Sequence, residues 1–302
     1  MRKFLISMAA LSAAIVPAAA ADLYLPAPEE VMGYGPPAVS GINGKAEILG
    51  GFRDFDGEDS FIGAIGGTVS IPVGHSFGVQ LDAAASISDD DTAVGGVIHA
   101  FMRDPSSYLI GITAGVVRTD SGNILSAVGA EGELYLDRVS LEAWAGYARL
   151  DYNDDFAIDD LDGGFFIGDV AWYANDNWRL AIGGSYILEE ASLNLSTEYQ
   201  FDTLPFSVTG QVSFAKGDNI TATVGLRGYF GAPTDRSLIE RHRQDDPRNR
   251  GLELIGETSS QIFETPAEVS EPPIEEPEFP PVPECPPGST LPFPACFPLP
   301  PL

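Results

Sequence analysis

Apolar and polar residues alternate with a period of two over most of residues 41–231, and clusters of turn-forming residues interrupt the alternation. In one clear stretch, Leu193 and Leu195 fall on one side of an extended chain, while Asn194 and Ser196 fall on the other. A helix would instead repeat its apolar positions with a longer period. The pattern therefore predicts a region built from β-strands.

The alternation predicts about 12 strands in this region. Most of them reach ~11 residues, which suits a tilted strand that crosses a bilayer and exceeds the ~5–6 residues of a globular strand. Acidic links such as 54–59 and 151–160 alternate along the chain with shorter turns such as 72–75 and 175–177. The expected strand spans are 43–53, 60–72, 76–88, 92–103, 107–119, 122–136, 138–151, 161–174, 177–188, 190–202, 204–215 and 218–231.

Alternation of this kind also fits a soluble β-sandwich, in which the apolar face is buried in a dry core. Strand length, the N-terminal segment and the last strand favour a membrane barrel instead. The sheet must then close on itself, because lipid cannot satisfy an open backbone edge. We therefore expect an all-β fold, an antiparallel up-and-down transmembrane β-barrel with disordered Pro-rich N- and C-terminal extensions. An even strand number places both termini on the periplasmic side.

The segments that flank the alternating region differ from it in composition. Residues 1–20 combine a basic start, a short apolar run and a small-residue end, which predicts a signal peptide. Residues 21–40 form a Pro-rich periplasmic leader, and residues 232–302 form a polar segment followed by a disordered Pro/Glu-rich periplasmic tail. Within the polar segment, residues 234–250 fit one short helix. No run after the signal peptide reaches the ~18 apolar residues of a membrane helix.

Three features of the chain carry a resemblance to a known family. They are the strand-and-turn pattern of residues 41–231, the residues Gly225, Tyr229 and Phe230 at the end of the last strand, and Ala21 and Asp22 at the start of the mature chain. In these features the chain resembles outer-membrane β-barrel proteins of alphaproteobacteria, particularly porin-like ones. The resemblance implies that the barrel-assembly machinery reads the end of the last strand, although in that family the aromatic residue usually ends the chain and here a long tail follows. It also implies that transpeptidases join the N-terminus to peptidoglycan.

The charge of the chain limits the classes of molecule that we expect it to bind. The formal net charge is -28, with 44 acidic and 16 basic residues, so we expect no nucleic-acid partner. The expected partners are outer-membrane lipid, lipopolysaccharide, the barrel-assembly machinery and, as an alternative, peptidoglycan. Charged residues recur on the polar face of the strands, where a barrel would turn them toward its lumen. These candidate pore-lining residues are Glu47, Asp82, Arg103, Glu131, Glu133, Glu142, Asp169, Arg179, Glu198 and Arg227.

Catalytic and metal-binding patterns are missing from the sequence, so we expect no enzyme, no cofactor and no metal. Some 12-stranded barrels are lipases, but such an enzyme needs a histidine near the lipid face, and His99 falls on the predicted lumen face. The acidic links 89–91 and 151–160 are expected to be solvated loops. As an alternative, they bridge to lipopolysaccharide phosphates through shared divalent cations. Cys285 and Cys296 are expected to form a disulfide in the oxidising periplasm.

The function that these features favour is a small passive porin-like channel in the bacterial outer membrane. An excess of carboxylates over arginines in the lumen predicts a preference for cations and small polar solutes. Barrels of ~8 strands fill with side chains and barrels of ~16–18 strands hold an aqueous channel, so a barrel of this size can be open or plugged. In the plugged alternative, the lumen charges pair with one another. A second alternative is a structural anchor that is tethered to peptidoglycan through its mature N-terminus.

Overall fold

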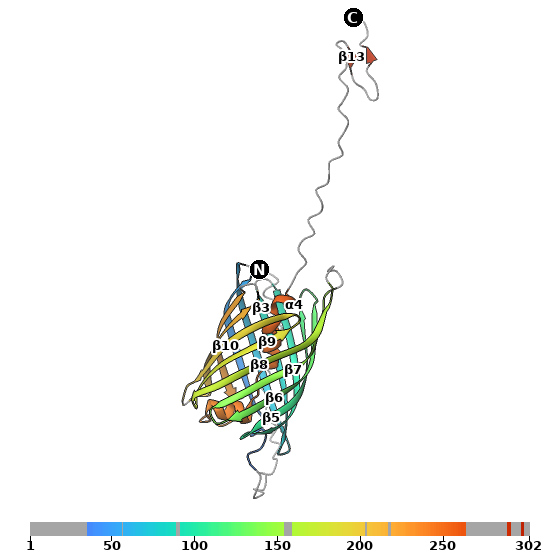
Figure 1. Cartoon of the computed structure of the whole chain (residues 1–302). Helices are drawn as coiled ribbons and strands as arrows, with labels where there is room; N and C mark the ends of the chain where they lie inside the picture. The colour runs from blue at the N-terminus through green and yellow to red at the C-terminus, as the bar shows by residue number, and fades with distance from the viewer. Residues whose placement is uncertain are drawn as a thin grey trace, which may run out of the picture.

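The computed structural model describes residues 35–55, 57–88, 91–153, 159–202, 204–216 and 219–263, together with the short strands β13 (Ser289–Thr290) and β14 (Phe297–Pro298). It confirms the predicted closed antiparallel barrel, in which each strand pairs with its neighbours in sequence (Figure 1). The barrel strands are β1 (Asn43–Phe55), β2 (Glu58–Val73), β3 (Phe77–Ser88), β4 (Asp91–Asp104), β5 (Tyr108–Thr119), β6 (Ile124–Leu136), β7 (Val139–Asp151), β8 (Leu161–Asn175), β9 (Trp178–Ile187), β10 (Glu190–Gln200), β11 (Phe206–Ala215) and β12 (Ile220–Phe230).

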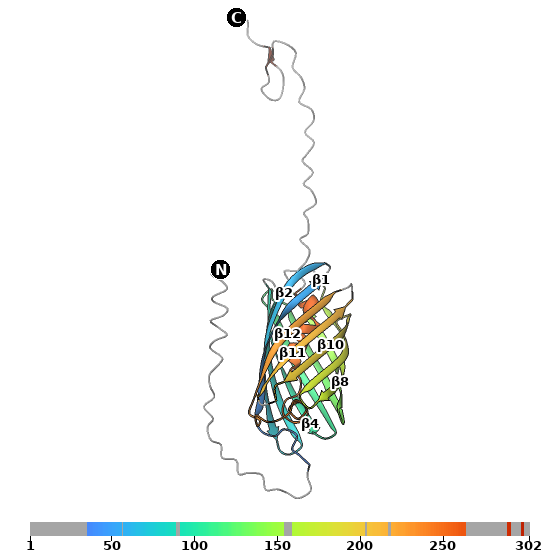
Figure 2. The same ribbon diagram turned by 90° about the vertical axis from the view of Figure 1, so that its left-hand side faces the viewer.

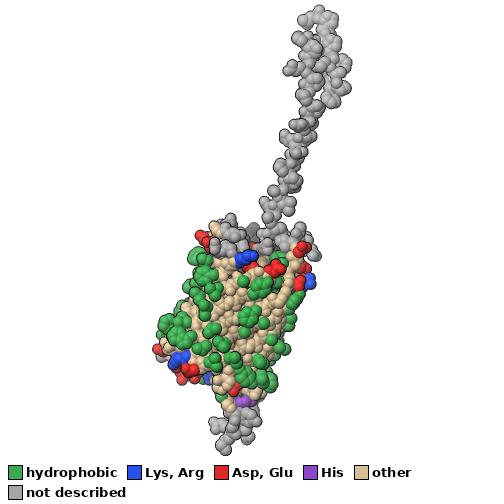
Figure 3. Space-filling view, viewed as in Figure 1, with side chains coloured by type: hydrophobic (Ala, Val, Ile, Leu, Met, Phe, Trp, Pro, Cys, Tyr) green, Lys and Arg blue, Asp and Glu red, His purple; other side chains and the backbone are tan. Residues whose placement is uncertain are grey.

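The outer surface of the barrel is apolar because alternate side chains of each strand point outward. Ile112 is 68% exposed and Val224 is 69% exposed, a state that aliphatic side chains keep in lipid and not in water. Hydrophobic side chains are spread over the barrel wall, while charged ones gather near its two ends (Figure 3). Trp172 and Phe230 lie near one end and Phe52 near the other, as in aromatic girdles at the two membrane interfaces. The surface is therefore that of a transmembrane barrel.

Pairing of β1 with β12 closes the barrel, and the two strands lie side by side in Figure 2. Their register joins Glu47 to Arg227 and Leu49 to Gly225. Gly51 lies so close to the neighbouring strand that a Cβ there would collide with the carbonyl oxygen of Ala222. The seam therefore depends on glycine at a point where two backbones approach each other.

The barrel has two ends, which we name by the strands that meet there. The terminal mouth is the end where β1 begins and β12 ends, and the links 74–76, 105–107, 137–138, 176–177 and 201–205 lie there. The far mouth is the opposite end and includes the links 120–123, 152–160 and 188–189. The longest link between neighbouring strands, 152–160, belongs to the far mouth.

The chain returns into the barrel after β12, which the sequence analysis does not predict. Residues 232–263, here called the plug, form α2 (Leu238–Glu240), the π-helical turn η1 (Arg241–Asp245), α3 (Arg250–Glu257) and α4 (Ser259–Ile262). Figure 1 shows α4 at the end of the barrel opposite the helical turns that follow β12. The prediction of one helix over 234–250 is wrong, because the chain is extended at Asp246 and α3 begins only at Arg250. No helix in the described part of the chain is long and apolar enough to cross a membrane.

The end of the leader also belongs to the barrel. Ala38 and Val39 are buried, and the amide of Ala38 donates to the carbonyl oxygen of His75 at 2.7 Å. Val39 packs against Phe101 and Tyr135 inside the terminal mouth. Residues 36–40 are thus part of the folded unit and not of a free leader.

Candidate functional site

The interior of the barrel holds all ten charged residues that the sequence analysis names as candidate pore-lining residues. Eight of them are buried, while Asp169 and Arg227 are partly buried. Seven of the ten are carboxylates and three are arginines. Within the plug, residues 241–250 add four arginines and two aspartates. The barrel wall is therefore acidic, and residues 241–250 bring an excess of arginine to it, although the plug as a whole carries five arginines and six acidic residues.

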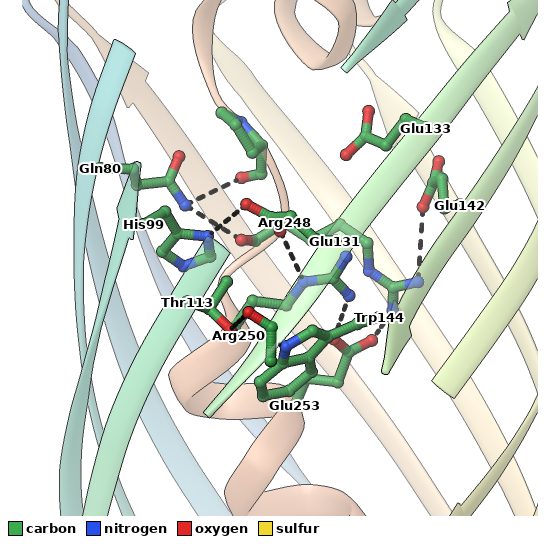
Figure 4. Close-up of polar contacts among 12 residues, drawn as sticks. Gln80, His99, Thr113, Glu131, Glu133, Glu142, Trp144, Arg248, Arg250 and Glu253 are labelled. Atoms are coloured by element: carbon green, nitrogen blue, oxygen red, sulfur yellow. Dashed lines mark hydrogen bonds and ion pairs between the residues drawn. The ribbon is translucent and has the colours of Figure 1, made fainter. Parts of the chain in front are cut away.

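One cluster on the wall is built around His99, which is fully buried (Figure 4). Its Nε2 lies 2.8 Å from Asp82 and its Nδ1 lies 2.9 Å from Glu131. Thr68 and Gln80 donate to the other oxygen of Asp82, each at 2.9 Å. Both ring nitrogens face carboxylates, an arrangement that suits a protonated ring and leaves neither nitrogen for a serine hydroxyl. The cluster thus has the character of a structural ion network and not of a hydrolase triad.

The plug completes this cluster through Arg250. Its amide donates to Asp82 at 2.7 Å, and its Nε lies 3.2 Å from Glu131. The guanidinium also pairs with Glu253 and lies over the ring of Trp144, 5.3 Å from the ring centroid. A buried carboxylate is costly unless a charge or donor faces it, so Arg250 compensates wall and plug carboxylates together.

A second set of contacts links the plug to β7, β8 and β9. Arg248 pairs with Asp169, with Glu142 at 3.4 Å and with Glu253 at 2.8 Å. Arg179 of the wall also binds Glu142, at 2.9 Å. Arg248 keeps 31% of its side chain exposed, whereas the carboxylates around it are buried. The contacts of Arg248 are therefore more accessible to solvent than those of Arg250.

A third set lies across the seam near the terminal mouth. Arg227 of β12 pairs with Glu47 of β1 at 2.6 Å and with Glu198 of β10. Glu198 also accepts from Tyr229 at 2.6 Å and lies 3.4 Å from His242 of the plug. Through these contacts, Arg227 and Glu198 link β1, β10 and β12 to one another and to the plug.

The far half of the plug is held by polar caps and by small wall residues. The side chain of Asn249 accepts from the amide of Leu252 at 2.9 Å and so begins α3. Leu252 lies over Gly66, where any side chain would collide with it. Near the end of α3, Glu257 accepts from Ser185 at 2.5 Å and from Asn194 at 2.9 Å. The wall therefore makes room for the helix with glycine and binds it with hydroxyl and amide groups.

A cavity of about 240 Å³ remains between the plug and the wall. Its wall side is formed largely by strands next to the seam, and Gln211 is exposed within it. The lining combines apolar side chains with charged groups of both signs. Residues that line it include Glu47, Arg53, Glu198, Thr209, Gln211 and Arg227.

The carboxyl group of Asp246, in the plug, is buried without hydrogen bonds to the described residues. Both of its carboxyl oxygens are buried and have no hydrogen-bond partner among the described residues. Lys45 lies nearby, but its Nζ donates to the carbonyl oxygens of Asp246 and Pro247, at 3.5 and 2.6 Å. Among the described residues, the Asp246 carboxyl is thus buried without a hydrogen-bond donor that faces it.

The remaining candidate residues predicted from the sequence lie at the seam or outside the described residues. Tyr229 points into the barrel and Phe230 points outward, while Gly225 faces Leu49 at the seam. A Cβ on Gly225 would come within 2.7 Å of the carbonyl oxygen of Ile48. These positions have a packing role at the seam, and recognition by the assembly machinery stays a prediction. The candidate attachment residues Ala21 and Asp22 and the candidate disulfide Cys285–Cys296 lie outside the described residues.

The plug arginines Arg248 and Arg250 are the functional residues that the sequence analysis missed. They stand in the run RHRQDDPRNR, which has no periodicity and resembles a solvated charged stretch. A signal was nevertheless present, since a wall rich in carboxylates with few basic residues requires compensation from elsewhere in the chain. In the described residues, no group of histidine, cysteine and acidic side chains has the geometry of a metal site.

Comparison with known proteins identifies no family for this chain. No family model matches the chain, and no curated protein is similar to it at a significant level. Among solved structures, the chain is similar to the KdgM porin, with 12% identity over 62% of this chain and 99% of that one and a TM-score of 0.49. It is also similar to the NanC porin, with 9% identity over 61% and 98% of the two chains and a TM-score of 0.46. A third similar structure is outer membrane phospholipase A from Escherichia coli, with 8% identity over 66% and 93% and a TM-score of 0.43. Such distant similarity does not bear on the activity of this chain.

Proposed function

We propose that this chain is a bacterial outer-membrane porin-like channel whose lumen is closed by its own C-terminal plug. The observation that carries the proposal is the acidic, polar wall of the barrel, whose carboxylates Glu131, Glu142 and Asp169 pair with Arg248 and Arg250 of the plug. A barrel that only anchored the chain could fill its interior with apolar side chains, as a protein core does. A wall of buried carboxylates needs either water or cationic partners, and the plug supplies the partners.

The same wall gives the open state a preference for cations. With the plug displaced, seven carboxylates and three arginines of the candidate set face the lumen, a difference of four negative charges. Rings and clusters of carboxylates attract cations and repel anions within a narrow pore. The solutes that fit this lining are small, polar and neutral or positively charged. No catalytic role is proposed for His99, because both of its nitrogens are occupied by carboxylates.

Conductance across a planar bilayer tests the proposal. We expect the refolded full chain to conduct little, and the double variant Arg248→Glu, Arg250→Glu to conduct steadily because its plug is repelled by the wall. In a salt gradient, the reversal potential of the double variant should show cation preference. Neutralising Glu131, Glu133 and Glu198 to glutamine in that background should reduce the preference.

Heat-modifiable migration on a gel would show that each variant remains a folded barrel. A folded double variant that conducts no ions would reject the channel. That result would favour the second candidate, a structural anchor tethered through Ala21, which the filled lumen also fits. A muropeptide mass on the N-terminal peptide after lysozyme digestion is the expected sign of such a tether.

A further inference from the structure

The plug runs through the barrel from one mouth to the other, with contacts at the terminal mouth, midway along the wall and, through Ser260 and Glu190, at the far mouth. At the terminal mouth, the amide of Leu238 donates to the side chain of Asn177 at 3.0 Å. Midway, Arg250 contacts Glu131 of β6. The plug therefore crosses the full length of the wall and does not turn back toward the end where it entered.

The last residues of the plug are fixed at the far mouth. The hydroxyl of Ser260 donates to Glu190, at the start of β10, at 2.8 Å. The side chain of Asn123, in the link between β5 and β6, donates to the carbonyl oxygen of Ile262 at 3.1 Å. The hydroxyl of Tyr152, in the longest link, donates to the carbonyl oxygen of Gln261 at 3.4 Å. The described part of the plug therefore ends at the far mouth.

The two mouths open on opposite sides of the membrane, so residues 35–42 and residues 260–262 lie on opposite sides. Residues 35–42 lie at the terminal mouth, where Ala38 is bonded to His75. In outer-membrane barrels the short turns face the periplasm and the longer loops face the outside. By this rule the terminal mouth is periplasmic and the far mouth, with link 152–160, is external.

We propose that the barrel displays its own C-terminal segment, residues 264–302, on the cell surface, and that the plug is the part of the chain that remains in the passage. The proposal rests on the outer-membrane location given under the proposed function. It replaces the sequence-based expectation that the whole tail is periplasmic. The displayed segment is acidic and proline-rich, and no lysine or arginine follows Arg250 in the sequence. It adds a second function to the barrel, the export of a segment of the same chain.

Cysteine labelling of intact Gram-negative cells that make the full chain tests the proposal. In a background with Cys285→Ser and Cys296→Ser, single cysteines are introduced as Ser270→Cys in the segment, Lys216→Cys at the far mouth and Ser107→Cys at the terminal mouth. Lys216 and Ser107 are both exposed in the structure, so they form a matched pair. The reagent is a polyethylene-glycol maleimide too large to enter the lumen.

We expect Ser270→Cys to be labelled in intact cells to the same extent as Lys216→Cys. Ser107→Cys should be labelled only after the outer membrane is permeabilised. If Ser270→Cys instead follows Ser107→Cys, the segment shares the compartment of the terminal mouth and display is wrong. If Ser107→Cys is labelled in intact cells and Lys216→Cys is not, the barrel is oriented the other way and display is also wrong. Labelling does not depend on conductance, so these failures are distinct from a failure of the channel.

Discussion

Replacing Arg250 with alanine should release the plug from the barrel. The change removes the guanidinium that Glu131 and Glu253 share, and it removes the side chain that covers Trp144. Among the charged groups of the described residues, Glu131 then keeps only His99 and Glu253 keeps only Arg248. Breaking a buried ion pair from one side costs about 3–5 kcal/mol, enough to shift a docked segment largely to its undocked state. We therefore expect a folded barrel in which the plug arginines become accessible to trypsin.

Limited trypsin digestion of the folded protein measures this accessibility. The parent should resist cleavage within residues 241–250, whereas Arg250→Ala should be cut there. The control is Arg149→Ala, since Arg149 pairs with Asp151 and Asp160 at the far mouth and stays half exposed. An exposed pair contributes only about 0–1 kcal/mol, so this variant should behave as the parent does. Equal resistance of Arg250→Ala and the parent would contradict the role of Arg250 in docking.

Gly51→Ala should prevent the barrel from closing. A Cβ at this position would overlap the backbone of β12 at Ala222 and Thr223, and no flexible side chain stands there to move aside. Overpacking in a tight core typically costs 1–3 kcal/mol, and a clash between two backbones at the seam lies at the upper end of that range or beyond it. We expect a clear loss of folded, heat-modifiable protein after refolding into detergent.

The adjacent glycine provides the matched control. A Cβ on Gly50 would meet only the ring of Phe61, at 3.8 Å, which is ordinary contact. Gly50→Ala should therefore refold with the yield of the parent. Comparable folded fractions for Gly50→Ala and Gly51→Ala would show that the seam tolerates the added carbon and that the argument for its closeness is wrong.

The barrel was predictable because its determinants are local. A strand with one face in lipid and the other in the lumen must alternate, so each segment carries its own evidence. The predicted span 138–151 compares with Val139–Asp151 in the structure, and 161–174 compares with Leu161–Asn175. The side on which Glu131 and Glu198 lie also follows from alternation, and both side chains point into the barrel.

The plug was not predictable because its determinants are distant. Arg250 meets Glu131, which lies 119 positions earlier in the chain, and no local pattern records that meeting. The helix α3 is short, and α2 and η1 are separated from it by an extended stretch. Short helices of this kind depend on tertiary contacts and not on propensity. Consequently, sequence reasoning placed the charged wall correctly inside the barrel but left open whether water or protein faces it.

Cross-linking of the plug to the far mouth tests the central claim most directly. In the chain with Cys285→Ser and Cys296→Ser, Ser260→Cys is paired with Glu190→Cys, because the side chains of Ser260 and Glu190 are 2.8 Å apart. A short bifunctional thiol reagent should join this pair in the membrane-inserted barrel. It should not join Ser260→Cys to Ser107→Cys at the terminal mouth. Cross-linking of the second pair and not of the first would show that the plug does not thread the lumen, and the account of a closed, self-plugged barrel would be wrong.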